Sequence, residues 1–157
     1  MVTAVLRAKS EWDGKERLRL WVRLLRVARA VEAQLRERLQ AEFDTTLPRF
    51  DVMAALFRAP DGMTMSEVSR FLLVSNGNVT GIVDRLVSDG LVARANRDGD
   101  RRVSLVRLTP AGRAAFRKMA SAHQRWVDEL LEGVHVDEAR LVAAKLQALQ
   151  SRWESVR

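Results

Sequence analysis

Apolar residues recur every three to four positions along most of the chain, a spacing typical of amphipathic helices. The longest such stretch runs from Lys15 to about Glu42 and contains Leu18, Trp21, Leu25, Ala28, Val31, Leu35 and Leu39. Residues 1–14 lack the pattern, so we expect a frayed lead-in that ends at Gly14. A helix of about 28 residues exceeds the usual globular length and needs a sizeable apolar partner. That partner is either a bundle within the chain or, as we favour, a second copy.

A shorter helix is expected after residue 47. Pro48 suits the first turn of a helix, because its missing N–H group would be unpaired there in any case. Turn residues at 60–62 end this helix, and Met63 is expected to form a stub of strand. The apolar face of the helix consists of Phe50, Met53, Ala54, Leu56 and Phe57.

Two short helices follow, joined by a tight turn. Thr64 and Glu67 have the spacing of a capping box and start the first of them. Ser75 or Asn76 caps the second, and Gly90 stands where a left-handed residue normally ends a helix. This arrangement is the pattern of a helix-turn-helix.

A β-hairpin is expected directly after these helices. Residues 91–95 and 103–108 read as its strands, and residues 96–101 as its loop, with Asp98-Gly99 as the turn dipeptide. Thr109-Pro110 is then a cap followed by a proline suited to the first turn of a new helix. The hairpin makes the helix-turn-helix a winged one.

The rest of the chain is helical again. One helix runs from residue 110 to about 131, Glu132-Gly133 breaks it, and Asp137 is expected to cap the last helix. The sequence thus predicts a mainly α fold with a small β-wing, in a single domain over residues 1–157. Within it, residues 48–109 form the winged helix-turn-helix lobe, and residues 15–47 and 110–156 form flanking dimerisation helices.

Composition narrows the possible functions. Cysteine is absent and only two histidines are present, which excludes disulfides and thiolate chemistry and leaves no metal cluster. We find neither a nucleophile–histidine constellation nor a phosphate-cradling glycine loop, so we expect neither an enzyme nor a cofactor. No apolar run approaches the length of a membrane span and no secretory signal is visible, so we expect a cytoplasmic protein without a membrane partner.

The charge of the chain is compatible with a polyanionic partner. The net charge is +7 and comes mainly from arginine, but a GC-rich genome is another source of an arginine-rich composition. The distribution of charge is more informative, because residues 94–107 hold five arginines and two aspartates.

The second helix of the motif starts with short, neutral, hydrogen-bonding residues, where a solvated helix face usually carries charges. Asparagine pairs with adenine, and serine and threonine bond to several base edges. Glycine in a helix costs about 1 kcal/mol against alanine, which close approach to DNA would offset. The plain alternative is a turn that runs into a helix. The candidate base contacts are Ser75, Asn76, Gly77, Asn78, Thr80 and Gly81.

Arginines at the hairpin tip suit the minor groove of DNA, where the potential is most negative. Arg97, Arg101 and Arg102 are the candidates, and Asp100 would orient one of the last two. The alternative is a solvated charged turn. Further candidates for phosphate contacts are Arg85 and Arg70, and Thr64 and Ser66 at a helix N-terminus.

These motifs together resemble the multiple antibiotic resistance regulator (MarR) family. Asp100-Arg101-Arg102, five residues and Leu108-Thr109 are similar to the family signature D-x-R-x5-L-T. Residues 75–80 and 86–92 resemble the recognition helix and the turn after it, and the resemblance covers about residues 15–155.

The resemblance implies a homodimer that binds double-stranded DNA at a pseudo-palindromic operator. Such proteins are repressors, less often activators, and are often released by a small aromatic acid. By position, residues 75–80 would enter the major groove, Arg102 with Arg101 the minor groove, and Asp100 would brace the wing. The family's ligand pocket lies between the dimerisation helices and the lobe. Its candidate residues here, each of which could instead be ordinary core, are Trp21, Arg29, Met53, Phe57, His123 and Trp126. The alternative function is a winged-helix module that binds protein and no operator.

Overall fold

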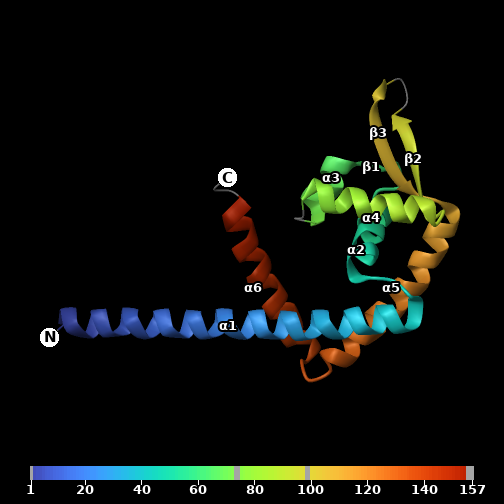
Figure 1. Ribbon diagram of the computed structural model, residues 1–157. Helices are drawn as coiled ribbons and strands as arrows, with labels where there is room; N and C mark the ends of the chain where they lie inside the picture. The colour runs from blue at the N-terminus through green and yellow to red at the C-terminus, as the bar shows by residue number, and fades with distance from the viewer. Residues whose placement is uncertain (1, 73–74, 98–99, 155–157) are drawn as a thin grey trace. The chain divides into compact units, whose positions relative to one another are not determined.

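The computed structural model describes residues 2–72, 75–97 and 100–154. Its elements are, in chain order, α1 (Val2–Phe43), α2 (Leu47–Arg58), β1 (Met63–Thr64), α3 (Met65–Leu72), α4 (Asn76–Ser88), β2 (Val92–Arg97), β3 (Asp100–Leu108), α5 (Pro110–Leu130) and α6 (Val136–Glu154) (Figure 1). The predicted fold class, mainly helical with a small β-wing, is confirmed. Backbone contacts divide the chain into two compact units, residues 1–123 and 124–157.

Helices α2, α3 and α4 pack against one another beside a three-stranded antiparallel sheet with strand order β1-β3-β2. We call residues 47–109, from α2 to β3, the lobe. The two-residue strand β1 pairs Met63 with Val106 and Thr64 with Leu105, so the predicted stub of strand is real. Side chains of fully buried residues fill the lobe's interior, among them Val52, Met53, Leu56, Val68, Val79, Val83, Leu86 and Val106.

The predicted helix starts inside the lobe are largely confirmed. Thr64 and Glu67 form a reciprocal capping box: the Glu67 N–H donates to Thr64 Oγ1 at 3.2 Å, and the Thr64 N–H donates to Glu67 Oε2 at 2.7 Å. Ser75 occupies the N-cap position of α4, without a side-chain capping bond. Gly90 has φ +71°, as its place after α4 required.

The start of α5 is tied to the end of α4. Thr109 Oγ1 accepts the Gly112 N–H at 3.0 Å and donates to the Gly90 carbonyl at 2.8 Å. The Thr109 N–H also donates to the Leu91 carbonyl at 3.0 Å. The predicted cap is therefore present, and it also fixes how closely α5 approaches the α4–β2 junction.

Three predicted boundaries are wrong. Helix α1 begins at Val2, so residues 2–14 are helical and not a frayed lead-in. The hairpin strands reach Arg97 and Asp100, because ladder pairing continues past Asn96 through an irregularity in register. The expected Asp98-Gly99 turn lies outside the described residues.

The third wrong boundary is the cap of the last helix, which is His135 and not Asp137. The His135 N–H donates to Glu138 Oε2 at 3.0 Å, and its carbonyl accepts the Ala139 N–H at 2.9 Å. Asp137 instead lies in the first turn, where its charge suits the helix dipole.

The apolar stripe of α1 has two environments. Leu35 and Leu39 are buried, whereas Leu18 and Trp21, nearer the N-terminus, are more than half exposed. One end of this helix therefore belongs to the core of residues 1–123, and the other end offers apolar surface.

No helix within residues 2–72, 75–97 and 100–154 has an apolar stretch long enough to cross a membrane.

Candidate nucleic-acid interface

Helix α4 has one buried and one exposed face. Val79, Val83 and Leu86 are completely buried and hold the helix on the lobe. The residues exposed at its start and along its outer face are Ser75, Gly77, Asn78, Thr80, Gly81, Asp84 and Arg85. The side chain of Asn76 lies outside the described residues. The spacing of the apolar positions thus places most of the predicted base contacts on one solvent-facing surface.

The two glycines of α4 have no role in internal packing. A Cβ atom added at Gly77 or Gly81 would meet no other atom within 4 Å. Since alanine forms helix better than glycine, the fold itself would be more stable with alanine at both positions. Packing within the folded monomer therefore does not explain the bare helix surface.

Two ion pairs hold α4 against its neighbours, and sequence reasoning missed both. Arg94 on β2 donates to Asp84 on α4 at 2.5 Å between Nη2 and Oδ1, which connects the wing's first strand to the helix. Arg49 on α2 pairs with Asp89, the residue that ends α4. The residues of each pair are distant in the sequence, so no local spacing could have indicated them.

The predicted wing residues flank the tip of the hairpin. Arg97 is the last residue of β2 and pairs in register with Asp100, the first residue of β3. Arg101 and Arg102 follow on β3. Their side chains lie outside the described residues, so their roles stay predictions.

The predicted phosphate contacts at the start of α3 differ in their availability. The Thr64 hydroxyl is engaged in the capping box, and the Glu67 carboxylate lies at the same helix end. A carboxylate there opposes the approach of a phosphate. Ser66 is exposed in the first turn, and Arg70 is exposed in the last turn of the same helix.

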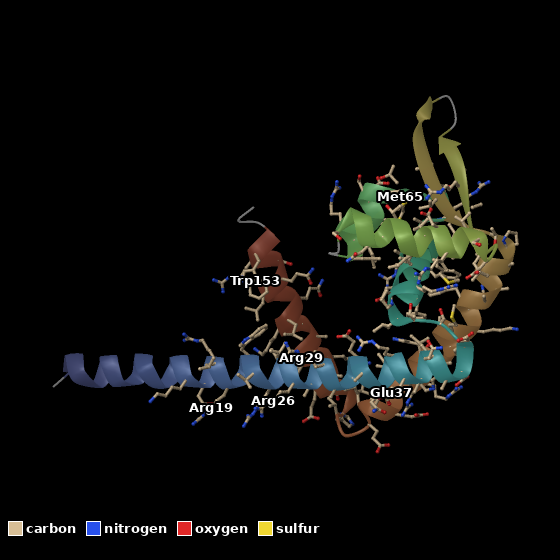
Figure 2. All side chains as sticks on the ribbon, viewed as in Figure 1. Arg19, Arg26, Arg29, Glu37, Met65 and Trp153 are labelled. Atoms are coloured by element: carbon tan, nitrogen blue, oxygen red, sulfur yellow. The ribbon has the colours of Figure 1, made fainter. Side chains whose placement is uncertain are left out.

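The candidate ligand residues do not form one pocket. Trp21 is 58% exposed, and Arg29 is exposed on α1 (Figure 2). Met53 and Trp126 are buried. Phe57 and His123 join a ring cluster that belongs to the core.

In this cluster the Phe57 and Phe50 rings lie 4.9 and 5.4 Å from that of Phe116, and the His123 ring stacks on Phe50 at 4.7 Å. Burial lowers the pKa of His123, because the apolar surroundings disfavour the charged imidazolium. These contacts make His123 a neutral packing residue at neutral pH.

Open space lies elsewhere in residues 1–123. One hollow of about 460 Å³, here called the α1–α4 hollow, is lined by Glu32, Arg36, Leu47, Pro48, Asp51, Leu72, Asn78 and Ile82. Burial raises the pKa of Asp51, and the nearby Glu32 carboxylate raises it further. Arg36 already pairs with Glu32 at 2.6 Å. The hollow therefore has more negative than positive charge on its wall.

A second space of about 460 Å³, here called the α2–α5 hollow, lies between the end of α1, α2 and the start of α5. Its lining consists of Phe43, Asp44, Thr45, Arg49, Met53, Leu91, Ala111, Ala114, Ala115, Lys118 and Met119. Among the six candidate ligand residues, Met53 alone lines either of these two hollows.

Comparison with known proteins identifies the family. A sequence profile of the MarR family matches residues 43–103. The transcriptional activatory protein BadR of Rhodopseudomonas palustris is 35% identical over 112 residues, which cover 69% of this chain and 63% of BadR. The chain thus spans less than two thirds of that relative.

Solved structures extend the similarity over most of the chain. A mutant of MarR from E. coli in complex with operator DNA is 29% identical, with a TM-score of 0.74 over 85% of this chain and 95% of that one. A MarR family transcriptional regulator from Silicibacter pomeroyi is 36% identical, with a TM-score of 0.72 over 91% of this chain and 96% of that one. Given this agreement in sequence and fold, the chain belongs to the MarR family of helix-turn-helix transcriptional regulators.

Proposed function

We propose that the chain is a homodimeric regulator that binds a pseudo-palindromic DNA operator, with α4 in the major groove and the wing in the minor groove. The observation that carries the proposal is the exposed face of α4, which is neutral, hydrogen-bonding and interrupted by two glycines without internal contacts. Asn78 and Thr80 present groups that can bond to base edges, and the glycines let the backbone approach the duplex. The E. coli MarR relative, solved with operator DNA, supports this reading.

A second copy is the occupant we propose for the exposed apolar surface at both ends of the chain. On α6, Val142, Leu146, Leu149 and Trp153 are exposed at spacings of four, three and four residues, which places them on one helix face. On α1, Leu18 and Trp21 are exposed in the same way. Apolar patches of this kind mark interfaces. Two-fold pairing would also present two α4 helices, as a pseudo-palindromic operator requires.

The position of α4 next to a hollow supports regulation by a small ligand. Asn78 lines the α1–α4 hollow while also belonging to the proposed base-reading face. However, the carboxylates of Glu32 and Asp51 oppose an aromatic acid in that space.

We propose no catalytic activity for the chain, since its relatives are transcriptional regulators.

A substitution of Gly81 by alanine is expected to have opposite effects on the stability of the fold and on the affinity for DNA. Gly81→Ala is expected to stabilise the free protein by up to about 1 kcal/mol, because alanine forms helix better than glycine. The same methyl group is expected to weaken operator binding roughly tenfold, about 1.4 kcal/mol, since it holds the helix away from the duplex. Thermal unfolding and fluorescence anisotropy with a duplex selected from genomic fragments measure the two effects.

Gly14→Ala is the matched control, since Gly14 is also helical with nothing within 4 Å of an added Cβ. It should leave operator affinity unchanged. Operator binding by Gly81→Ala at wild-type strength would remove α4 from the interface.

The wing is tested by Arg102→Ala. The change is expected to weaken operator binding by at least about 1 kcal/mol and to reduce its salt dependence, because a cation in the minor groove is lost. Titrations at several salt concentrations measure both. Arg140→Ala removes one positive charge from α6, where Arg140 pairs with Asp137, and serves as the control.

Unchanged operator binding by Arg102→Ala would show that the wing does not contact DNA. Absent or salt-independent DNA binding by the unmodified chain would instead favour the alternative, a winged-helix module for protein partners.

A further inference from the structure

The N-terminal half of α1 carries a concentration of positive charge. Residues 15–29 contain six basic residues and one acidic residue, whereas residues 32–42 of the same helix contain two basic and three acidic ones. An arginine-rich composition alone would not separate the charges along one helix. Residues 15–29 therefore form a distinct basic segment, which the proposed contacts of the lobe with the operator do not use.

Part of this segment forms one exposed face of the helix, here called the α1 basic face. Its residues are Lys15, Arg19, Arg23 and Arg26. At about 100° per residue, the three arginines lie roughly 160–220° around the helix from Leu39 and roughly 140–200° from Trp21. Figure 2 shows Arg19 and Arg26 projecting from the same side of α1. The face is thus opposite both the buried Leu39 and the exposed apolar Trp21.

The arginines of the α1 basic face are available to a partner. Arg23 and Arg26 are exposed and make no ion pair with any described side chain. Arg19 pairs with Glu16, but both side chains are about 60% exposed, so water and ions compete for the pair. Like charges three or four residues apart repel one another on a helix, so this pattern does not stabilise the free protein.

Two of the possible negative partners conflict with the position of this face. Residues 128–138 contain five acidic residues and no lysine or arginine, so a second copy offers a negative segment. However, the proposed contact with a second copy uses the side of α1 that holds Leu18 and Trp21. A helix on an anionic membrane inserts its apolar side, which the second copy would already cover.

The third possible partner, nucleic acid, matches the length of the α1 basic face. From Lys15 to Arg26 the face extends about 16 Å along the helix axis. B-DNA carries one phosphate charge per about 1.7 Å of its axis, so the face can follow about five base pairs of backbone. Exposed arginines without base-reading neighbours would contact phosphates and would not select a sequence.

We propose that the α1 basic face binds the phosphate backbone of a second DNA segment, without sequence preference, while the lobes hold the operator. The regulator then bridges two DNA segments. Bridging rests on the proposed function, because the lobes must hold the first segment, whereas the binding of DNA by α1 does not.

A capture experiment with the full-length protein tests the proposal. An operator duplex, selected from genomic fragments, is immobilised and loaded with the protein, and a fluorescent duplex of random sequence is then added. The protein should retain the second duplex, and added salt should release it. Replacing both Arg23→Gln and Arg26→Gln should reduce this retention at least about fivefold, because two phosphate contacts are lost. The amount of protein on the operator should stay the same.

The matched control replaces both Arg140→Gln and Arg152→Gln, which removes the same charge from exposed positions of α6. It should leave the capture of the second duplex unchanged. Protein retained on the operator measures the proposed function, and captured random duplex measures this inference. If the operator does not retain the protein, direct titration with the random duplex replaces the capture, and the variant of α1 should still bind at least about fivefold more weakly.

The proposal is wrong if the random duplex is not captured, if the α1 variant captures it as well as the parent, or if the control loses as much. Binding of vesicles of phosphatidylglycerol and phosphatidylcholine, without binding of the random duplex, would assign the face to anionic lipid. Weaker self-association of the α1 variant in sedimentation equilibrium, again without capture by the parent, would assign it to residues 128–138 of the second copy.

Discussion

Leu146→Glu is expected to break the proposed dimer. Leu146 is 42% exposed in the single chain, so the change costs the monomer little. The interface would bury the exposed 42% of each Leu146, which contributes roughly 0.6–1.3 kcal/mol per copy. A glutamate there would also lose its hydration, which costs about 1–3 kcal/mol or more, and a two-fold interface contains the residue twice. The loss of at least about 3 kcal/mol raises the dissociation constant on the order of 100-fold or more. Sedimentation equilibrium measures it.

The affinity for the operator should decrease when the dimer dissociates, because each half-site is then bound by a separate monomer. Gln147→Glu is the control, since it places the same charge on α6 one position further, away from the apolar face. An unchanged monomer–dimer equilibrium in Leu146→Glu would exclude α6 from the association surface. Equal effects of both variants would point to net charge instead of the apolar contact.

Gly112→Ala is expected to destabilise the folded protein by about 1–3 kcal/mol, the usual cost of overpacking. A Cβ atom on residue 112 would lie 1.9 Å from the Leu91 carbonyl oxygen, which is far inside contact distance. That oxygen cannot move away freely, because it accepts the Thr109 N–H at 3.0 Å. Accommodating the methyl group therefore means separating α5 from the α4–β2 junction. Urea unfolding measures the free energy.

Gly81→Ala provides a comparison with the same chemical change at another helical glycine. Because the space around Gly81 is open, its stability change should have the opposite sign. A Gly112→Ala protein as stable as the parent would show that α5 can shift at this point without cost.

The parts of the fold that follow from local spacing were predictable. The apolar spacing predicts a buried face of α4 made of Val79, Ile82, Val83, Leu86 and Val87. Val79, Val83 and Leu86 are completely buried, and the other two are half-buried. Thr64 and Glu67 showed a capping box because both partners lie within one helical turn. The hydrogen-bonding face of α4 followed from the same periodicity, since burying one face exposes the other.

Other features depend on contacts that sequence spacing does not encode. Arg49 and Asp89 are 40 residues apart, so their pairing appears only once α2 and α4 are packed. The role of Gly112 depends on the position of a backbone oxygen on another element. His135, and not the expected Asp137, is the cap, because its N–H donates to Glu138 and its carbonyl accepts the Ala139 N–H.

The two environments of α1 impose a limit on how this chain can vary in length. Its apolar stripe is continuous, with Leu18 and Trp21 exposed and Leu35 and Leu39 buried. Each residue turns an α-helix by about 100°, so one residue inserted between Trp21 and Leu35 would rotate the exposed part of the stripe by that angle relative to the buried part. Insertions or deletions there preserve the alignment only in steps close to whole turns. Helical phase thus links the core of residues 1–123 to the direction in which the chain would meet the proposed second copy.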